Sequence, residues 1–341
     1  MTIREAIATL LDGRSLSEDE MAAVMGEVMG GEATPAQIGA FLVLLRRKGE
    51  TVDELVGAAR VMREKVTPIR VARGAVLDTC GTGGDARGTF NISTAAALVA
   101  AASGCTVAKH GNRAMSGAVG GADVLEQLGV RIDVPPERTE RLLGELGFGF
   151  LFAPLLHGAM KHAAGPRREL GVRTLFNLLG PLTNPAGARH QLLGVFDGAW
   201  VEPVANVLRR LGSMHALVVH GEDGLDEITI SSGTTVAELR HGNVNLMRIH
   251  PQDFGLRCCR TEELQVRDAA DSAARIRSVL DSERGPARDV VLLNAGAAIY
   301  VADGASSIGE GIGRAAETID SGRAKRLLEE LAAASHDEAA P

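Results

Sequence analysis

The sequence predicts an α/β protein with a small N-terminal all-helical domain and a larger α/β domain built on a mostly parallel central sheet. The first 70 residues show helix starts and helical apolar spacing. After Pro68, short apolar runs alternate with helical patterns, as in βαβ units. The 341 residues are enough for both domains. We place them at 1–70 and 71–341, and expect helices near 165–185 to join the first domain.

The N-terminal segment contains three helix-start signals. Capping boxes begin at Ser17 and Thr51, and Thr34-Pro35 is an N-cap followed by proline in the first turn. We expect these helices to end near Gly30, Gly49 and Lys65. The segment carries an apolar stripe and no pocket chemistry, which favours a packing and oligomerisation module.

Short apolar runs mark the strands of the larger domain. We expect strands at 75–79, 105–109, 149–152, 191–196, 216–219 and 290–293, and helices at 95–102, 121–128, 136–146, 201–211, 268–280 and 308–331. Ligands of such sheets bind at the carboxyl ends of the strands. This rule places four segments on one rim: 81–85, 109–113, 154–157 and 221–227.

Composition excludes several classes of protein. The formal net charge of −7 argues against general affinity for nucleic acid. The four cysteines lack C-x-x-C spacing, which argues against a zinc site or a redox pair. The N-terminus does not resemble a signal peptide, and no apolar run approaches membrane-spanning length. We therefore expect a reducing, cytoplasmic setting.

The most informative segment is Gly81-Thr82-Gly83-Gly84-Asp85, followed by Asn91-Ile92-Ser93-Thr94 at the start of an alanine-rich helix. Glycines allow close approach of the backbone to a ligand, and helix starts bind anions. Together the two pieces predict a phosphate pocket. Taken alone, the glycine turn is equally consistent with a plain connection between strand and helix.

Two further segments carry candidate ligands. Lys109 to Arg113 supplies two cations around a glycine, which suits a phosphorylated sugar, although an exposed loop paired with acids is the alternative. Asp226-Glu227 follows a predicted strand and could hold Mg²⁺, although acidic turns are usually only solvated.

The segment 157–174 adds two histidines and two adjacent arginines. His157 and His162 are five residues apart, so they do not share a helix face as a pair of zinc ligands would. Arg167 and Arg168 point in different directions, so at most one of them can grip a substrate carboxylate. The other is structural, and a surface salt bridge is the alternative for either.

Taken together, these pieces resemble the anthranilate phosphoribosyltransferase family. The matching segments are 81–85, 91–94, 109–116, 167–174, 176–184 and 224–227, with the N-terminal helices in addition. The resemblance implies a nucleoside phosphorylase/phosphoribosyltransferase-like fold. It also implies transfer of the phosphoribosyl group of 5-phosphoribosyl 1-pyrophosphate (PRPP) to the amine of anthranilate, a step of tryptophan biosynthesis.

The resemblance also implies site residues. Those for PRPP are Gly81, Gly84, Asp85, Thr89, Asn91, Ile92, Ser93, Thr94, Lys109, His110, Gly111, Asn112, Arg113, Ala114, Met115, Ser116, Gly117 and Gly121. Those for anthranilate are Gly81, Asn112, His157 and Arg167, with Pro154 and Met160 as packing surfaces. Lys109, His110, Asn112 and Arg167 would be the catalytic set. Ser93, Asp226 and Glu227 would bind Mg²⁺, two ions per subunit, in a homodimer formed through the N-terminal helices.

One pair of positions departs from the family pattern. After Ser116 the family usually continues with a lysine and a serine before a glycine, where this chain has Ala118 and Val119. We expect weaker substrate binding and retained activity. Two rival functions are possible for such a chain. A pyrimidine nucleoside phosphorylase-like enzyme would carry a lysine–serine–glycine loop at 109–113, and a non-catalytic nucleic-acid-binding relative would have lost Arg167 and the acidic pair.

Overall fold

The computed structural model describes residues 1–72, 74–84, 87–114 and 119–337. Four helices form the N-terminal bundle: α1 (Ile3–Leu11), α2 (Glu18–Gly30), α3 (Pro35–Lys48) and α4 (Val52–Lys65). Each begins with a capping box, in which the N-cap hydroxyl accepts a backbone N–H and the third residue reaches back. The three predicted helix starts are confirmed.

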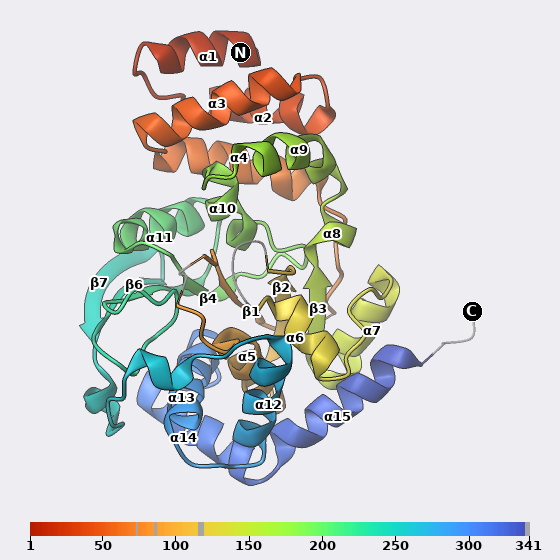
Figure 1. Ribbon diagram of the computed structural model, residues 1–341, viewed down its shortest axis with the longest axis vertical. Helices are drawn as coiled ribbons and strands as arrows, with labels where there is room; N and C mark the ends of the chain where they lie inside the picture. Colours follow the sequence, from red (N-terminus) through yellow and green to blue (C-terminus); the bar gives the residue numbers. More distant parts are fainter. Residues whose placement is uncertain (73, 85–86, 115–118, 338–341) are drawn as a thin grey trace.

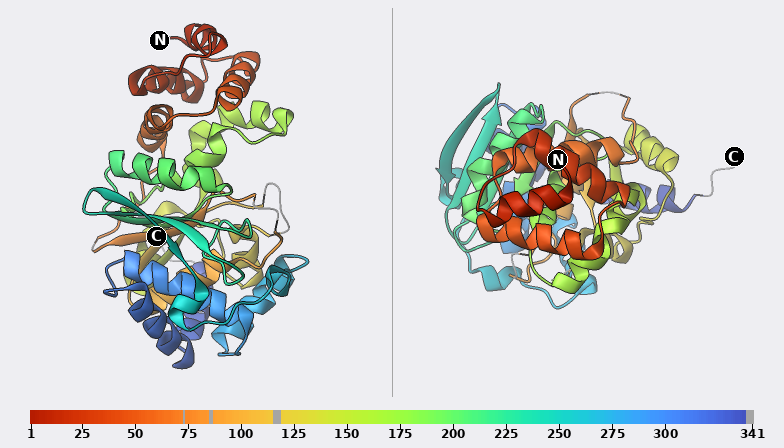
Figure 2. Two further views of the ribbon diagram at one scale, coloured as in Figure 1. Left: turned by 90° about the vertical axis from the view of Figure 1, so that its left-hand side faces the viewer. Right: turned by 90° about the horizontal axis from the view of Figure 1, so that it is seen from above.

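Two later helices return to this bundle. α9 (Lys161–Leu170) packs beside α2 and α3, and α10 (Leu175–Leu179) packs against α4 (Figures 1 and 2). Their apolar side chains share one buried cluster with the bundle, and the contributors from this segment are Ala163, Leu175, Phe176, Leu178 and Leu179. The helical part therefore combines chain segments that lie far apart in the sequence.

A seven-stranded sheet forms the centre of the larger part, in the order β3-β2-β1-β4-β5-β6-β7. Its strands are β1 (Val76–Gly81), β2 (Thr106–Gly111), β3 (Phe148–Phe152), β4 (His190–Gly194), β5 (His215–Gly221), β6 (Thr234–Arg240) and β7 (Asn243–Ile249). In this order the strands from β3 to β5 pair in parallel, whereas β6 is antiparallel to β5 and β7 is antiparallel to β6. The predicted fold class is confirmed.

The strand predictions were correct for β1 to β5 and wrong for 290–293, which lies inside helix α13 (Pro286–Val301). This helix is buried on nearly all sides, so a short, wholly apolar run does not distinguish it from a buried strand. β6 and β7 were missed. They form a hairpin whose two connecting residues, His241 and Gly242, both have positive φ, as a tight hairpin turn requires.

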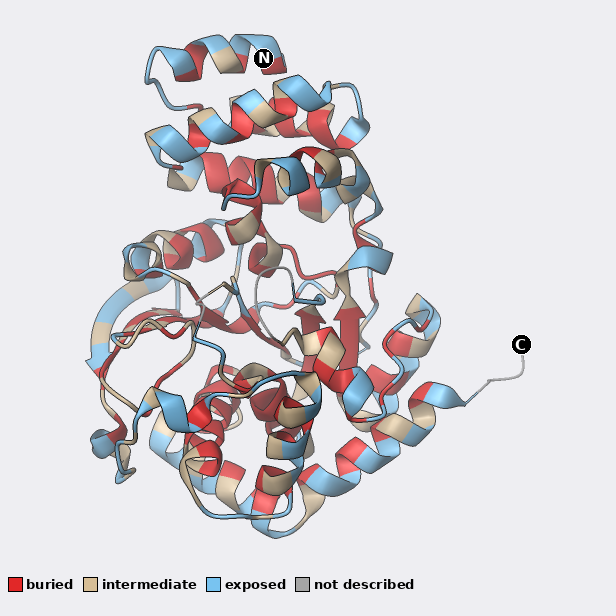
Figure 3. Cartoon of the chain, in the orientation of Figure 1, coloured by how far each residue is buried: buried red, intermediate tan, exposed pale blue. Residues whose placement is uncertain are grey.

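Helices cover both faces of the sheet (Figure 1). On one face lie α5 (Ile92–Ala102), α12 (Ala269–Leu280), α13, α14 (Ile308–Asp320) and α15 (Arg323–His336); α11 (Val201–Arg210) and the helical bundle cover the other. α6 (Gly121–Gln127) and α7 (Pro136–Leu146) lie on the side of β2 and β3. The helix expected over 308–331 is divided in two at Gly322, which has φ +73°. Buried residues concentrate between these layers (Figure 3).

No helix within the described residues is both long and apolar enough to cross a membrane.

Candidate functional site

The candidate site lies where the parallel strands end. Gly81 pairs with Gly194 and Gly111 pairs with Phe152, so the carboxyl ends of β1, β4, β2 and β3 reach the same edge of the sheet. The segments that follow these strands therefore share one rim, as the sequence predicts.

The first element of the site is the glycine loop, residues Gly81 to Gly84. The backbone N–H of Thr82 donates to the carbonyl of Gly194 at 2.9 Å, and that of Gly83 donates to Oδ2 of Asp226 at 2.9 Å. A Cβ on Gly81 would lie 2.7 Å from the same Asp226 oxygen. The absence of a side chain at Gly81 therefore allows this close approach, and the loop lies directly against the acidic turn formed by Asp226 and Glu227.

The second element is the start of α5. Oδ1 of Asn91 accepts the N–H of Thr94 at 3.0 Å and the hydroxyl of Ser93 at 3.3 Å. The hydroxyl of Thr94 is buried and has no hydrogen-bond partner within the described part of the chain. Ile92 is buried in the core, so it can offer a ligand only its backbone. The helix therefore presents short polar groups at its positive end.

Lys109 links these two elements. The side chain is buried, and Nζ donates to the carbonyl of Thr79 at 2.5 Å and to Oγ of Ser93 at 3.1 Å. Burial lowers the pKa of the Lys109 ammonium, and the nearby carboxylates of Asp78 and Glu227 oppose that shift. Lys109 thus places a desolvated amine between the helix start and the acidic turn.

A buried carboxylate beneath the rim holds the β2 end in place. Oδ1 of Asp78 accepts the N–H of His110 at 3.1 Å, and Oδ2 accepts Nδ2 of Asn184 at 2.8 Å. Burial raises the pKa of Asp78. Neither Asp78 nor Asn184 is among the predicted site residues, although an aspartate inside an apolar strand is a signal that it needs buried partners.

His110, on β2, and His157, which follows α8, form a buried pair. Their Nε2 atoms are 3.0 Å apart. Burial lowers the pKa of His110 to about 3, helped by the neighbouring His157, and burial lowers the pKa of His157 to about 4. Both rings are therefore neutral near neutral pH.

Arg113 pairs with acidic residues, which the sequence left open as the alternative to binding a phosphorylated sugar. It is exposed and forms ion pairs with Asp123 at 3.1 Å and Glu126 at 2.5 Å, and its guanidinium lies 5.7 Å from the centre of the Phe152 ring. Its neighbour Asn112 is also exposed, at the rim. Contact of Arg113 with a phosphate stays a prediction, and it would compete with these acids.

The remaining predicted PRPP residues fall into three groups. Gly121, the first residue of α6, lies close to Thr94 and Lys109, since a Cβ there would be 3.5 Å from Oγ1 and 3.8 Å from Cε. Ala114 donates its N–H to Asp123, while Thr89 forms a β-bridge with Gln265. Asp85, Met115, Ser116, Gly117 and Ala118 lie outside the described residues.

Arg167 comes from the helical part, on α9. Its side chain is half-buried, its guanidinium lies 5.0 Å from the centre of the Phe176 ring, and burial lowers its pKa. Arg168 is exposed, so the two arginines do point in different directions. Pro154 opens the short helix α8 (Ala153–Leu156), and Met160 packs at the edge of the helical core. Candidate anthranilate residues thus come from both parts of the chain.

A further arginine was missed by the sequence analysis. Arg173, in the connection between α9 and α10, donates a hydrogen bond to the carbonyl of Gly84 and stacks on Phe196 at 4.4 Å. It lies within the segment that carries the family resemblance, but its neighbours in space are distant in sequence.

The oxygen atoms at the rim fit a hard cation. Ser93 supplies a hydroxyl and Asp226 and Glu227 supply carboxylates, and both carboxylates lie close enough to Lys109 to influence its pKa. Within the described residues no cluster of three or more His, Cys, Asp or Glu side chains could hold a metal by itself. The set therefore suits Mg²⁺, which keeps water ligands and shares substrate phosphates.

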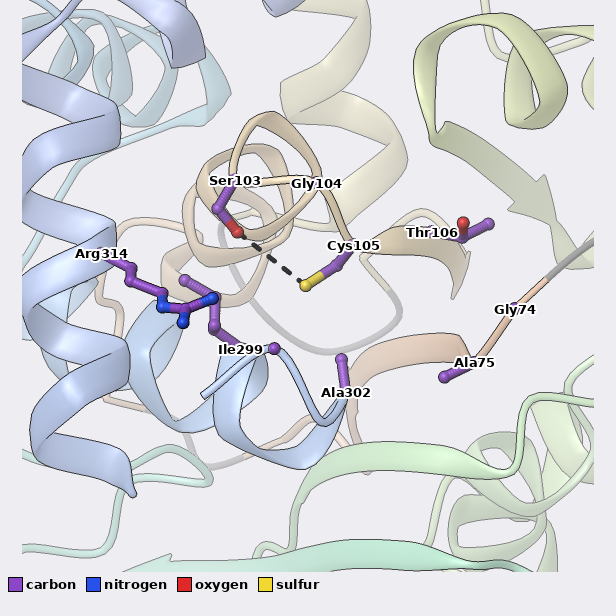
Figure 4. Close-up of a pocket in the computed structure, with 10 residues that line it drawn as sticks. Gly74, Ala75, Ser103, Gly104, Cys105, Thr106, Ile299, Ala302 and Arg314 are labelled. Atoms are coloured by element: carbon purple, nitrogen blue, oxygen red, sulfur yellow. Dashed lines mark hydrogen bonds between the residues drawn. The ribbon is translucent and has the colours of Figure 1, made fainter. Parts of the chain in front are cut away.

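A separate cavity of about 280 Å³ lies at the opposite edge of the sheet, at the start of β1 and β2 (Figure 4). Its lining includes Gly74, Cys105 and Arg314. Arg314 is paired with Glu310 at 2.7 Å, and burial raises the pKa of the Cys105 thiol. This cavity contains none of the predicted site residues.

Comparison with known proteins gives a consistent result. The pattern described as "Glycosyl transferase family, a/b domain" matches residues 73–325, and "Glycosyl transferase family, helical bundle domain" matches residues 4–66. The anthranilate phosphoribosyltransferase of Thioalkalivibrio sulfidiphilus is 60% identical over 97% of this chain and 98% of its own length. That of Methylococcus capsulatus is 56% identical over 100% of both chains.

Solved structures agree with these relatives. The crystal structure of the Thermus thermophilus enzyme of the same name superposes with a TM-score of 0.92 and 46% identity, covering 97% of this chain and 99% of that one. The Saccharomyces cerevisiae enzyme in complex with PRPP and Mg has a TM-score of 0.89 and 26% identity, covering 98% and 97%. These relatives share the helical bundle and the mostly parallel sheet described above over nearly the whole chain. The chain therefore belongs to the anthranilate phosphoribosyltransferase family.

Proposed function

We propose that this chain transfers the phosphoribosyl group of PRPP to the amine of anthranilate, giving N-(5-phosphoribosyl)anthranilate and pyrophosphate. One observation carries the proposal: the glycine loop, Lys109 and Asp226 meet at one rim of the sheet, as a phosphate and metal site requires. Arg167, the candidate partner of the substrate carboxylate, lies against Phe176 in the helical part. The yeast relative has been solved in complex with PRPP and Mg, and also in complex with 4-fluoroanthranilate. These two complexes support PRPP and anthranilate as the substrates.

PRPP would bind along the rim. Backbone N–H groups at the α5 start offer hydrogen bonds to phosphate oxygens, and the helix dipole favours their charge. In the glycine loop the N–H groups of Thr82 and Gly83 already donate to Gly194 and Asp226, so this loop contributes close approach of its backbone. The Thr94 hydroxyl, buried and without a partner within the described chain, is a further donor. Lys109 supplies a cation whose burial strengthens its interaction with a phosphate.

Mg²⁺ would be held by Ser93, Asp226 and Glu227, and we propose two ions per subunit. When bound, the metal neutralises charge on the leaving pyrophosphate. The residues present fit this role because they offer oxygen ligands only, and Mg²⁺ completes its coordination with substrate oxygens and water. Asp226 already lies against the glycine loop, so metal and phosphate would be neighbours.

Anthranilate would lie between the two parts of the chain. Arg167 would grip the substrate carboxylate and Asn112 would position the amine, with the neutral His110–His157 pair lining the path. The aromatic amine is uncharged near neutral pH, so it needs no strong general base. The residues would act mainly by orienting the nucleophile and by neutralising charge while an oxocarbenium-like centre develops at the ribose.

Two further proposals concern assembly and location. We propose a homodimer formed through the N-terminal helices, supported by the exposed apolar side chains of Leu11 and Val43 on α1 and α3. We also propose a cytoplasmic location, which four free cysteines fit.

The direct test is loss of anthranilate fluorescence on incubation with the protein, PRPP and Mg²⁺. We expect fluorescence to fall only when all three are present, with pyrophosphate released in equal amount. Omission of PRPP, or chelation of Mg²⁺, should abolish the change. Unchanged fluorescence in the complete mixture, with a folded protein, would contradict the proposal.

A further inference from the structure

Arg173 is the one residue of the α9–α10 connection whose side chain reaches the glycine loop by a hydrogen bond within the described residues. The connection begins at Gly171, which ends α9 in the left-handed conformation with φ +60°. It ends at Thr174, the N-cap of α10. Arg173 is exposed, so nothing in the core explains where its guanidinium lies.

The guanidinium contacts two groups of the larger domain. It donates to the carbonyl of Gly84, and its carbon lies 4.4 Å from the centre of the Phe196 ring, which is a cation–π contact. A Cβ on Gly84 would come within 3.1 Å of Nη2 and 3.4 Å of Nε. Gly84 also has φ +80°, so both its space and its backbone conformation favour glycine.

Phe196 is itself tied to the glycine loop. Its N–H donates to the hydroxyl of Thr82 at 2.9 Å, and the N–H of Thr82 donates to Gly194 at the end of β4. The loop is therefore held by β4 through Thr82, by the acidic turn through Gly83, and by Arg173 at Gly84. Only the last of these three attachments comes from the connection that follows α9.

We propose that Arg173 is a positioning residue for PRPP binding: it holds the carbonyl of Gly84 and thereby fixes the conformation of the glycine loop against which PRPP would lie. The same contact joins the loop to the connection that follows α9, the helix that carries Arg167. This inference rests on the proposed function for its kinetic readout.

The test replaces Arg173 by methionine, which keeps the stem and removes the donor and the charge. We expect the KM for PRPP to rise about tenfold, as loss of one charge-assisted hydrogen bond implies, with kcat and the KM for anthranilate changed less than about twofold. Arg173→Lys, which can still donate to Gly84, should recover part of the loss. Phe196→Leu should raise the PRPP KM about threefold.

Arg168→Met is the matched control, because Arg168 is exposed on α9 and has no ion pair within the described chain. It should leave both Michaelis constants unchanged. Equal rises in both KM values, no rescue by lysine, or a lowered Tm for Arg173→Met would overturn the positioning role. Calorimetric titration of each variant with PRPP in the presence of Mg²⁺ measures PRPP affinity without turnover. A wild-type protein that binds PRPP but does not act on anthranilate would contradict the proposed function. The effect of Arg173→Met on PRPP affinity could still be measured in that case.

Discussion

Nε2 of His157 lies 3.0 Å from Nε2 of His110, so only one of these two nitrogens can carry a proton in the neutral pair. One ring donates and the other accepts. Full protonation of both rings would place two N–H groups, and two charges, against each other in a buried site.

This pair predicts a pH dependence of stability. The pKa values in the folded protein are about 3 for His110 and about 4 for His157, below the ordinary value near 6.5. At pH values between the folded-state pKa and the ordinary pKa of each histidine, the unfolded chain binds protons that the folded chain does not. The free energy of unfolding should therefore fall as pH drops below about 6.5, by up to about 1.4 kcal/mol per pH unit for each histidine.

Urea unfolding at pH 7, 6 and 5 measures this effect. Other groups titrate in the same range, so the comparison is with the double variant His110→Gln, His157→Gln. The variant should show a shallower loss of stability on acidification. Identical pH slopes would show that the two imidazoles do not contribute.

Arg167 should decide anthranilate affinity. Its replacement by alanine removes a half-buried cation, and we expect the anthranilate KM to rise about thirtyfold, equivalent to ~2 kcal/mol, with the PRPP KM changed little. Steady-state kinetics with each substrate varied in turn provide the measurement. The exposed Arg168→Ala is the control. Equal rises in the KM for anthranilate and the KM for PRPP would contradict the assignment of Arg167 to anthranilate binding.

Asp226 should set the magnesium requirement. Asp226→Asn keeps an oxygen that can accept the N–H of Gly83 but loses the charge. We expect the Mg²⁺ concentration for half-maximal rate to rise at least about tenfold. Glu222→Gln in the same acidic segment is the control, since Glu222 is exposed and pairs only with the exposed Arg248 in the described chain. A similar shift in both variants would contradict a specific role.

The departure at Ala118 and Val119 predicts a gain on restoring the family residues. Ala118 lies outside the described residues, while Val119 packs against the core. Ala118→Lys restores the cation that the family usually carries at this position, so the PRPP KM should fall severalfold. Adding Val119→Ser removes apolar contact and should also lower Tm slightly. Unchanged Michaelis constants in both variants would argue against weakened substrate binding in this chain.

A buried ion pair should stabilise the helical bundle. Glu54 is fully buried and accepts from Lys48 at 3.0 Å, from the N–H of Leu16 at 2.9 Å and from the N–H of Thr51 at 2.8 Å. Glu54→Ala would leave the N–H groups of Leu16 and Thr51 without this acceptor and would remove the carboxylate from Lys48, which keeps its bonds to Ser15 and to the carbonyl of Gly49. We expect the change to cost about 3–5 kcal/mol of unfolding free energy. Chemical denaturation measures it, with Glu64→Ala on the same helix as the control. A loss below about 1 kcal/mol would refute this account.

Local patterns predicted the helix caps and the parallel strands because capping boxes and short apolar runs act through neighbours in sequence. The rim followed from topology alone. Prediction failed where burial surrounds an element, as for Val290 in α13, whose apolar run fits either secondary structure. It failed also where partners are distant: the contact of Arg173 with Gly84 spans 89 positions, and no pattern along the chain specifies it.

The return of α9 and α10 to the N-terminal bundle has a consequence during synthesis. The bundle ends at Lys65 and its remaining core side chains begin on α9 at Ala163, roughly 100 residues later. At about 5–20 residues per second, the first four helices leave the ribosome some 5–20 s before these partners exist. For that interval their apolar surface is incomplete, so the nascent bundle should be a site where chaperones engage this chain.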